Sequence, residues 1–241
     1  YSIAESLSRN ERLAALQDPD VGQSLDALRA CTKLMEQVVG DMLDFERIDS
    51  GRLELAKSAF SAVELLGEAE RALAPLARAK GIQVDFEPVP RMLHHRRYEG
   101  DMSRLMQCMS NGITNATKFT PRGGSIRVNC FESECVRPGR AVLHVQIHDT
   151  GVGLEPEELD RLARGGIFTQ VGKGQLQGQG GTGLGLNIVR QILALHDGSE
   201  LLLSSAGRDL GTCFEMRLQL PATDLDRVSK AGPGGAAGTD R

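Results

Sequence analysis

The 241-residue chain is 40% hydrophobic, which allows one well-buried core and a smaller second module. Its 28 basic and 32 acidic residues give a net charge of −4, and no basic face carries interleaved aromatic residues. Nucleic acid is therefore excluded as an expected partner. Neither a membrane-spanning apolar run nor a signal peptide is present. Because the chain begins at Tyr1, we expect a fragment of a longer parent that could be membrane-anchored. The fragment itself is expected to be cytoplasmic and to contact no membrane.

The five cysteines are odd in number, scattered and without a C-x-x-C pair, which favours reduced thiols over disulfides or zinc. Apolar residues recur weakly in residues 1–17 and every three or four residues in 22–49, on either side of a Pro19 turn. The pattern predicts an αα-hairpin over residues 1–50, with one buried stripe on its second helix. Such a hairpin usually dimerises to bury its stripe. Residues 51–59 are expected to form a linker.

Residues 60–221 are expected to form one domain, followed by a disordered tail over 222–241. The expected elements are a helix from Ser61 to about Ala79 with a kink or break at Pro75, a strand at 82–86, a helix from Asp101 to about Lys118, strands at 125–131 and 141–148, a helix at 184–195, and strands at 200–204 and 212–220. This order predicts an α+β fold. We expect a two-layer α/β sandwich with helices on one face of a mixed sheet, preceded by the helical hairpin.

Three segments carry candidate chemistry. Asn111, Asn115 and Lys118 lie at i, i+4 and i+7 and therefore share one helix face. Magnesium takes hard oxygen ligands and usually bridges substrate phosphates, so an amide oxygen suits it. Lys118 can lie against those phosphates. The alternative is the ordinary wet face of an amphipathic helix.

The second segment ends a strand at Asp149 and turns through Gly151 and Gly153. A carboxylate in this place can accept a hydrogen bond from an exocyclic amine such as adenine N6, and it would reject guanine. An ordinary strand-ending turn is the alternative.

The third segment is the glycine-rich stretch 178–185, which leads into a helix from about Leu184. Glycine N–H groups and a helix N-terminus together form an anion-binding site, and such loops also close over nucleotides. The alternatives are a surface loop and a dinucleotide-binding fingerprint. The fingerprint does not fit, because Gly181 follows a polar loop rather than a strand.

Taken in order, the three segments resemble the nucleotide-binding boxes of sensor histidine kinases. Residues 100–124 resemble the N box, 149–154 the G1 box and 180–189 the G2 box. Phe168-Thr169-Gln170 is similar to the F box, and residues 42–55 resemble the end of the dimerisation helix and its linker. The resemblance covers about residues 22–220. It implies the ATP-binding sandwich shared with gyrase, heat-shock chaperone and MutL ATPases.

The resemblance also implies a role for each matching residue. Asn115 would hold Mg²⁺, and Asn111 and Lys118 would contact the phosphates as the catalytic pair. Phe119 would flank the nucleotide, while Asp149 with Gly151 would bind adenine and Gly153 would give the base room. The phosphates would be wrapped by Gly181, Thr182, Gly183, Leu184 and Gly185. The Thr212 hydroxyl would support Asp149.

The activity implied is transfer of the ATP γ-phosphoryl to a histidine of a dimerisation helix, in a homodimer formed through the N-terminal helices. The expected further partner is a response regulator or receiver domain. ATP-hydrolysing relatives carry a glutamate where this chain has Asn111, which cannot act as a base at neutral pH, so transfer is favoured over hydrolysis. The family's acceptor histidine would fall upstream of Tyr1, and none of the five histidines fits its context. We therefore expect no self-phosphorylation by this chain.

Two alternatives stay open. One is a degenerate kinase that serves as a nucleotide-binding or dimerisation scaffold, and the other is an ATPase of the same fold. Magnesium-dependent ATP binding separates enzyme from inert scaffold, and steady phosphate release without a protein acceptor would indicate an ATPase.

Overall fold

The computed structural model describes residues 28, 32, 35, 39, 40, 42–48, 50–163 and 184–224. The chain divides into two compact units, Tyr1–Arg52 and Leu53–Arg241. In the first unit residues 42–48 are helical, within the helix expected at 22–49. Leu28, Met35 and Met42, three members of its apolar stripe, are 57%, 60% and 64% exposed. The single chain therefore leaves these positions open, and burial of the stripe by dimerisation stays a prediction. The rest of the expected hairpin lies outside the described residues.

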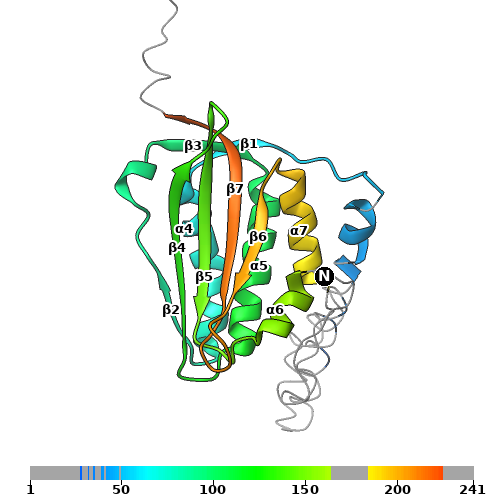
Figure 1. Ribbon diagram of the computed structural model, residues 1–241, viewed down its shortest axis with the longest axis vertical. Helices are drawn as coiled ribbons and strands as arrows, with labels where there is room; N and C mark the ends of the chain where they lie inside the picture. Colours follow the sequence, from blue (N-terminus) through cyan, green and yellow to red (C-terminus); the bar gives the residue numbers. More distant parts are fainter. Residues whose placement is uncertain are drawn as a thin grey trace, which may run out of the picture. The chain divides into compact units, whose positions relative to one another are not determined.

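The second unit contains one seven-stranded mixed sheet (Figure 1). Its strands are β1 (Ser58–Phe60), β2 (Gln83–Phe86), β3 (Arg96–Gly100), β4 (Ser125–Glu134), β5 (Arg140–Asp149), β6 (Glu200–Ser204) and β7 (Cys213–Asp224). They lie in the order β1-β3-β7-β5-β4-β2, and β6 also pairs with β7. β2 and β4 pair in parallel, while the other pairs are antiparallel.

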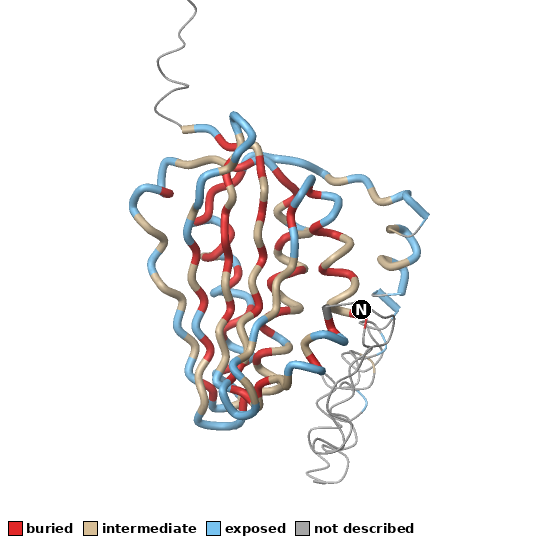
Figure 2. Tube along the Cα trace, viewed as in Figure 1, coloured by how far each residue is buried: buried red, intermediate tan, exposed pale blue. Residues whose placement is uncertain are grey.

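The helices cover one face of this sheet (Figure 1). They are α4 (Ala62–Ala79), α5 (Met102–Phe119), α6 (Pro156–Ala163) and α7 (Gly185–Leu195), with a short 3₁₀ helix η1 (Arg91–Leu93). Burial alternates along the central strands, as Figure 2 shows, because successive side chains point to opposite faces. In β7 the side chains facing the helices, Phe214, Met216, Leu218 and Leu220, are all buried. The predicted two-layer α+β fold is confirmed.

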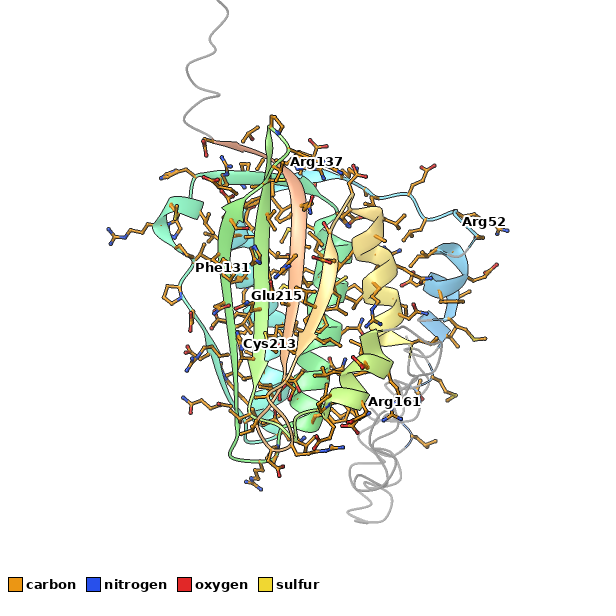
Figure 3. All side chains as sticks on the ribbon, in the orientation of Figure 1. Arg52, Phe131, Arg137, Arg161, Cys213 and Glu215 are labelled. Atoms are coloured by element: carbon orange, nitrogen blue, oxygen red, sulfur yellow. The ribbon has the colours of Figure 1, made fainter. Side chains whose placement is uncertain are left out.

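The opposite face of the sheet carries hydrogen-bonded polar side chains together with Phe131. Figure 3 labels Phe131 and Glu215. His144 stacks on Phe131 with ring centroids 4.3 Å apart, and its Nδ1 lies 2.9 Å from Glu215 Oε1. Although burial acts in the opposite sense, hydrogen bonds from His144, Gln146 and Arg217 lower the pKa of Glu215. His144 is therefore a structural residue, as expected.

Local sequence signals set the helix starts. Ser61 Oγ accepts from the N–H of Glu64 (3.1 Å), whose carboxylate accepts from the N–H of Ser61 (2.8 Å), so the predicted capping box is present. Asp101 Oδ1 accepts from the N–H of Arg104 (3.1 Å) and caps α5, also as predicted. Of the kink or break expected at Pro75, the break is wrong, since α4 continues through it to Ala79. Pro75 lies on the exposed side of α4.

Replacing Ser61 by alanine removes the side-chain half of the capping box. We expect Ser61→Ala to lower the free energy of unfolding by about 1 kcal/mol, because the N–H group of Glu64 at the start of α4 loses its side-chain acceptor. Urea denaturation measures the change, and Ser58→Ala, in the exposed part of β1, is the matched control. Equal stability of the two variants would contradict this account of the helix start.

Candidate nucleotide site

One face of α5 presents the first set of predicted residues. Asn111, Asn115 and Lys118 are all partly exposed, although the helix as a whole packs on the sheet. Asn111 Nδ2 donates to the carbonyl of Gln107 at 3.2 Å, which orients its amide. Lys118 Nζ lies 5.0 Å from the centroid of the Phe119 ring, within cation–π range. Burial lowers the pKa of Lys118. The face therefore offers two amides and a partly desolvated ammonium group.

Asp149 ends β5 with one carboxylate oxygen already committed. The N–H groups of Gly151 and Thr212 donate to Oδ1 at 2.8 and 3.2 Å. Burial raises the pKa of Asp149 above its ordinary value, while these two hydrogen bonds act to lower it. Oδ2 takes part in neither bond and can accept one from a ligand. The resemblance implies that the Thr212 hydroxyl supports Asp149. In the structure the backbone N–H of Thr212 makes this contact.

The loop between β6 and β7 holds the turn that follows Asp149. Ser205 Oγ accepts from the N–H of Leu154 (2.9 Å) and donates to the carbonyl of Gly211 (2.6 Å). The N–H of Asp209 donates to the carbonyl of Val152 at 2.8 Å. The contacts of the loop with the turn were not predicted, because Ser205 and Leu154 are 51 positions apart in the chain.

Two glycines allow the loop and the turn to approach so closely. A Cβ on Gly211 (φ +72°) would collide with the carbonyl oxygen of Asp149, and one on Gly153 (φ +62°) would collide with that of Gly207. Gly153 is therefore required by the neighbouring backbone. Its place beside an adenine base stays a prediction.

The turn also contacts the end of α5. The N–H of Val152 donates to the carbonyl of Phe119 at 3.3 Å. A Cβ on Gly151 would lie 2.7 Å from both that carbonyl oxygen and Asp149 Oδ1, so only glycine fits between them. The structure thus brings Phe119, Gly151 and Asp149 together, and their contact with a nucleotide stays a prediction.

The start of α7 contacts the same helix α5. Leu184 is 4% exposed, and a Cβ on Gly185 would collide with Asn111 Oδ1. The described end of the third segment therefore lies beside the first segment. Gly181, Thr182 and Gly183 lie outside the described residues, and so does Phe168-Thr169-Gln170.

The residues present suit a metal that also takes phosphate oxygens. Within 50–163 and 184–224 and the few described positions before them, no group of three His, Cys, Asp or Glu side chains could hold a metal ion. A protein-only cage is therefore not what these residues form. Asn115 offers one amide oxygen on the partly exposed face of α5. One such ligand, completed by phosphates and water, fits the way Mg²⁺ is usually bound.

Comparison with known families agrees with this geometry. Residues 100–222 match the family described as histidine kinase-, DNA gyrase B- and HSP90-like ATPases. The chain belongs to this family. The ATPase domain so identified begins at the end of β3 and contains α5, the Asp149 turn, α7 and the β6–β7 loop.

Similar proteins include three bacterial kinases. The histidine protein kinase DivJ of Caulobacter vibrioides is 36% identical over 181 residues, 75% of this chain and 28% of DivJ. The autoinducer 2 sensor kinase/phosphatase LuxQ of Vibrio parahaemolyticus is 31% identical over 85% of this chain and 23% of LuxQ. The sensor histidine kinase RcsC of Escherichia coli K12 is 33% identical over 86% of this chain and 21% of RcsC. The chain therefore spans between about a fifth and somewhat more than a quarter of the length of these relatives.

Solved structures show the same fold. Full-length ShkA, crystallised in complex with AMPPNP, superimposes with a TM-score of 0.66 over 86% of this chain and 40% of ShkA, at 24% identity. The Acinetobacter baumannii histidine kinase AdeS superimposes with a TM-score of 0.57 over 84% of this chain and 85% of that one, at 16% identity. Among the described residues of this ATPase-family chain, no helix has the length and apolarity of a membrane span.

The raised pKa of Asp149 predicts that the folded domain disfavours its charge. Between the ordinary and the raised pKa the folded state binds more protons than the unfolded state, so stability falls as pH rises through that window. We expect Asp149→Asn, whose Oδ1 can still accept both N–H bonds, to be more stable than the parent at pH 7, by less than about 1 kcal/mol.

The gain should shrink at pH 5, where more of the parent carboxyl is protonated. Denaturant titrations at both pH values measure it, with Asp85→Asn on the exposed side of β2 as the control. A variant less stable than the parent at pH 7 would show that the charge is favoured in the fold.

Proposed function

We propose that this chain is the ATP-binding catalytic core of a sensor histidine kinase. It transfers the γ-phosphoryl group of ATP to a histidine on a dimerisation helix, for onward signalling to a response regulator or receiver domain. The observation that carries the proposal is the Asp149 carboxylate, which has one oxygen held by two backbone N–H groups and the other outside both bonds. The family and the kinases named among its relatives support it.

The adenine end of the site rests on Asp149. Its Oδ2 accepts a hydrogen bond from adenine N6, and a guanine carbonyl in that place would be repelled. Because Oδ1 is fixed by Gly151 and Thr212, the carboxylate does not have to reorient when the base binds. Preorganisation of this kind keeps the ordering cost of binding low.

The phosphate end rests on α5 and the start of α7. Asn115 holds Mg²⁺ through its amide oxygen, and Lys118 and Asn111 contact the phosphates. Bound Mg²⁺ neutralises phosphate charge and orients the γ-phosphoryl group. Phosphoryl transfer depends mainly on such positioning and charge neutralisation. The residues expected to bind the phosphates in the glycine segment are Gly181, Thr182, Gly183, Leu184 and Gly185, of which the first three lie outside the described residues.

Asn111 favours transfer over hydrolysis. Its amide cannot take a proton from water at neutral pH, and it is engaged with the carbonyl of Gln107 and packed beside Gly185. A chain without a base here needs a nucleophile that is activated elsewhere. The imidazole of an acceptor histidine meets that need, because a neutral imidazole attacks without first losing a proton from the attacking nitrogen.

The proposed partner in the first unit is a second copy of the chain. The exposed apolar side chains of its helix, including Leu28, Met35 and Met42, recur at heptad spacing. Such a stripe is buried when two helical hairpins form a four-helix bundle. The fragment would act in the cytoplasm, whether or not its parent is anchored in a membrane.

The first test of this proposal is ATP affinity. We expect Asp149→Asn to weaken Mg²⁺-dependent ATP binding roughly 10- to 100-fold, because the loss of a hydrogen bond to a charged group costs about 1.5–3 kcal/mol and the new NH₂ group faces another donor. Calorimetry measures the affinity, with Asp85→Asn as the control. Unchanged affinity would remove the adenine contact, and a parent chain that binds no ATP would favour the scaffold.

The second test is transfer to an added acceptor hairpin. We expect Asn115→Asp to lower the transfer rate about tenfold or more while the fold persists, because a full negative charge is placed among the phosphates; tenfold is about 1.4 kcal/mol. Thr114→Asp adds the same charge at the neighbouring exposed position and is the control. Normal turnover of Asn115→Asp would remove the metal role. Steady phosphate release without the hairpin would favour the ATPase.

A further inference from the structure

Lys80, the residue that follows α4, contacts the C-terminal end of α5. Its Nζ donates to the carbonyls of Thr117 (2.6 Å), Lys118 (2.9 Å) and Thr120 (3.0 Å). Three backbone carbonyls of one helix end therefore converge on a single ammonium group. Hydrogen bonds from a charged donor are stronger than neutral ones, and a cation at a helix C-terminus also interacts favourably with the helix dipole.

Lys80 completes the hydrogen bonding of that helix end. The last four carbonyls of a helix lack partners within the helix. In α5 the carbonyl of Ala116 accepts from the N–H of Thr120 (2.9 Å), and that of Phe119 accepts from the N–H of Val152 (3.3 Å). The two carbonyls between them, of Thr117 and Lys118, are the ones that Lys80 binds. All four are thus paired.

The backbone of Lys80 is itself held in place. As the C-cap of α4, it donates its N–H to the carbonyl of Ala77 at 3.0 Å, and the N–H of Gly81 donates to the carbonyl of Arg78 at 2.9 Å. The next residue, Gly81, takes a left-handed conformation (φ +78°), and its carbonyl accepts from the N–H of Gly123 at 2.9 Å. The ammonium group therefore extends from a fixed point, and the segment after α5 is tied to the same turn.

We propose that Lys80 is a positioning residue of the nucleotide site. The inference rests on the proposed function, because the turn that Lys80 holds carries Lys118 and Phe119. Lys80 holds this turn on one side, and the Asp149 turn holds it on the other through Val152. By fixing the backbone of Lys118, Lys80 directs the ammonium group of Lys118 toward the phosphates. Lys80 itself does not contact the nucleotide.

The test is a double-mutant cycle on ATP affinity. We expect Lys80→Met to weaken Mg²⁺-dependent ATP binding about fivefold to tenfold, measured by calorimetry well below the unfolding temperature. In a Lys118→Met background the same change should cost less than twofold, because Lys80 acts through Lys118. Lys57→Met, an exposed lysine before β1, should leave affinity unchanged. An equal loss in both backgrounds would show a general structural role and overturn the inference.

Amide hydrogen exchange provides a readout that does not depend on ATP. We expect Lys80→Met to speed exchange of the Thr120 N–H, which closes the last turn of α5, and Lys57→Met to leave it unchanged. Lys80→Arg keeps the charge but not the compact donor, so it should restore part of the protection. If Lys80→Met speeds this exchange but the parent chain binds no ATP, the proposed function alone is contradicted. Unchanged exchange, or ATP binding unaffected by Lys80→Met, would sink this inference.

Discussion

The fixed orientation of the Asp149 carboxylate is the constraint on which the candidate site depends. One oxygen accepts two backbone hydrogen bonds, from Gly151 within its own turn and from Thr212 at the start of β7. The carboxylate is therefore aligned by the sheet itself. Burial disfavours the charged form of this carboxylate, as its raised pKa indicates. A partly buried carboxylate with a perturbed pKa and an oxygen available to a ligand is more typical of a functional site than of a structural one.

The glycines around Asp149 act through close backbone contact. Gly211 lies against the carbonyl of Asp149, and Gly153 lies against that of Gly207. Both approaches are so close that the Cβ of any other residue would collide. Read in the sequence, such glycines suggest flexibility. In the fold, the β6–β7 loop lies against the Asp149 turn, and Ser205 Oγ hydrogen-bonds to Leu154 of that turn and to Gly211 of its own loop. The same residues that loosen the unfolded chain thus give the folded turn its close packing.

The sequence predicts what depends on neighbours in the chain. The caps at Ser61 and Asp101, the alternating strands and the face shared by Asn111, Asn115 and Lys118 all follow from spacings of two to seven residues. It does not reveal β1 and β3, because β1 has only three residues and the mostly charged β3 (RRYEG) shows no apolar alternation. Both strands exist through their pairing partners.

Other parts of the site were hidden for the same reason. The contact of Lys80 with the end of α5 joins residues 37 or more apart, and the bracing by Ser205 joins it to Leu154 across 51. Neither follows from a local pattern. The sequence identifies the side chains of the candidate site, but it does not identify the contacts that hold them in place.

The start of α7 differs from those of α4 and α5 in a way that bears on phosphate binding. Ser61 and Asp101 cap α4 and α5 with side-chain acceptors, whereas the N-cap position of α7 is Leu184, which makes no side-chain cap hydrogen bond. The N–H groups at the start of a helix form its positive end, which interacts favourably with an anion. Because Gly185 packs against Asn111, the start of α7 lies beside the helix that carries the other proposed phosphate contacts. A phosphate bound at this start would therefore meet the positive end of α7 together with the polar face of α5.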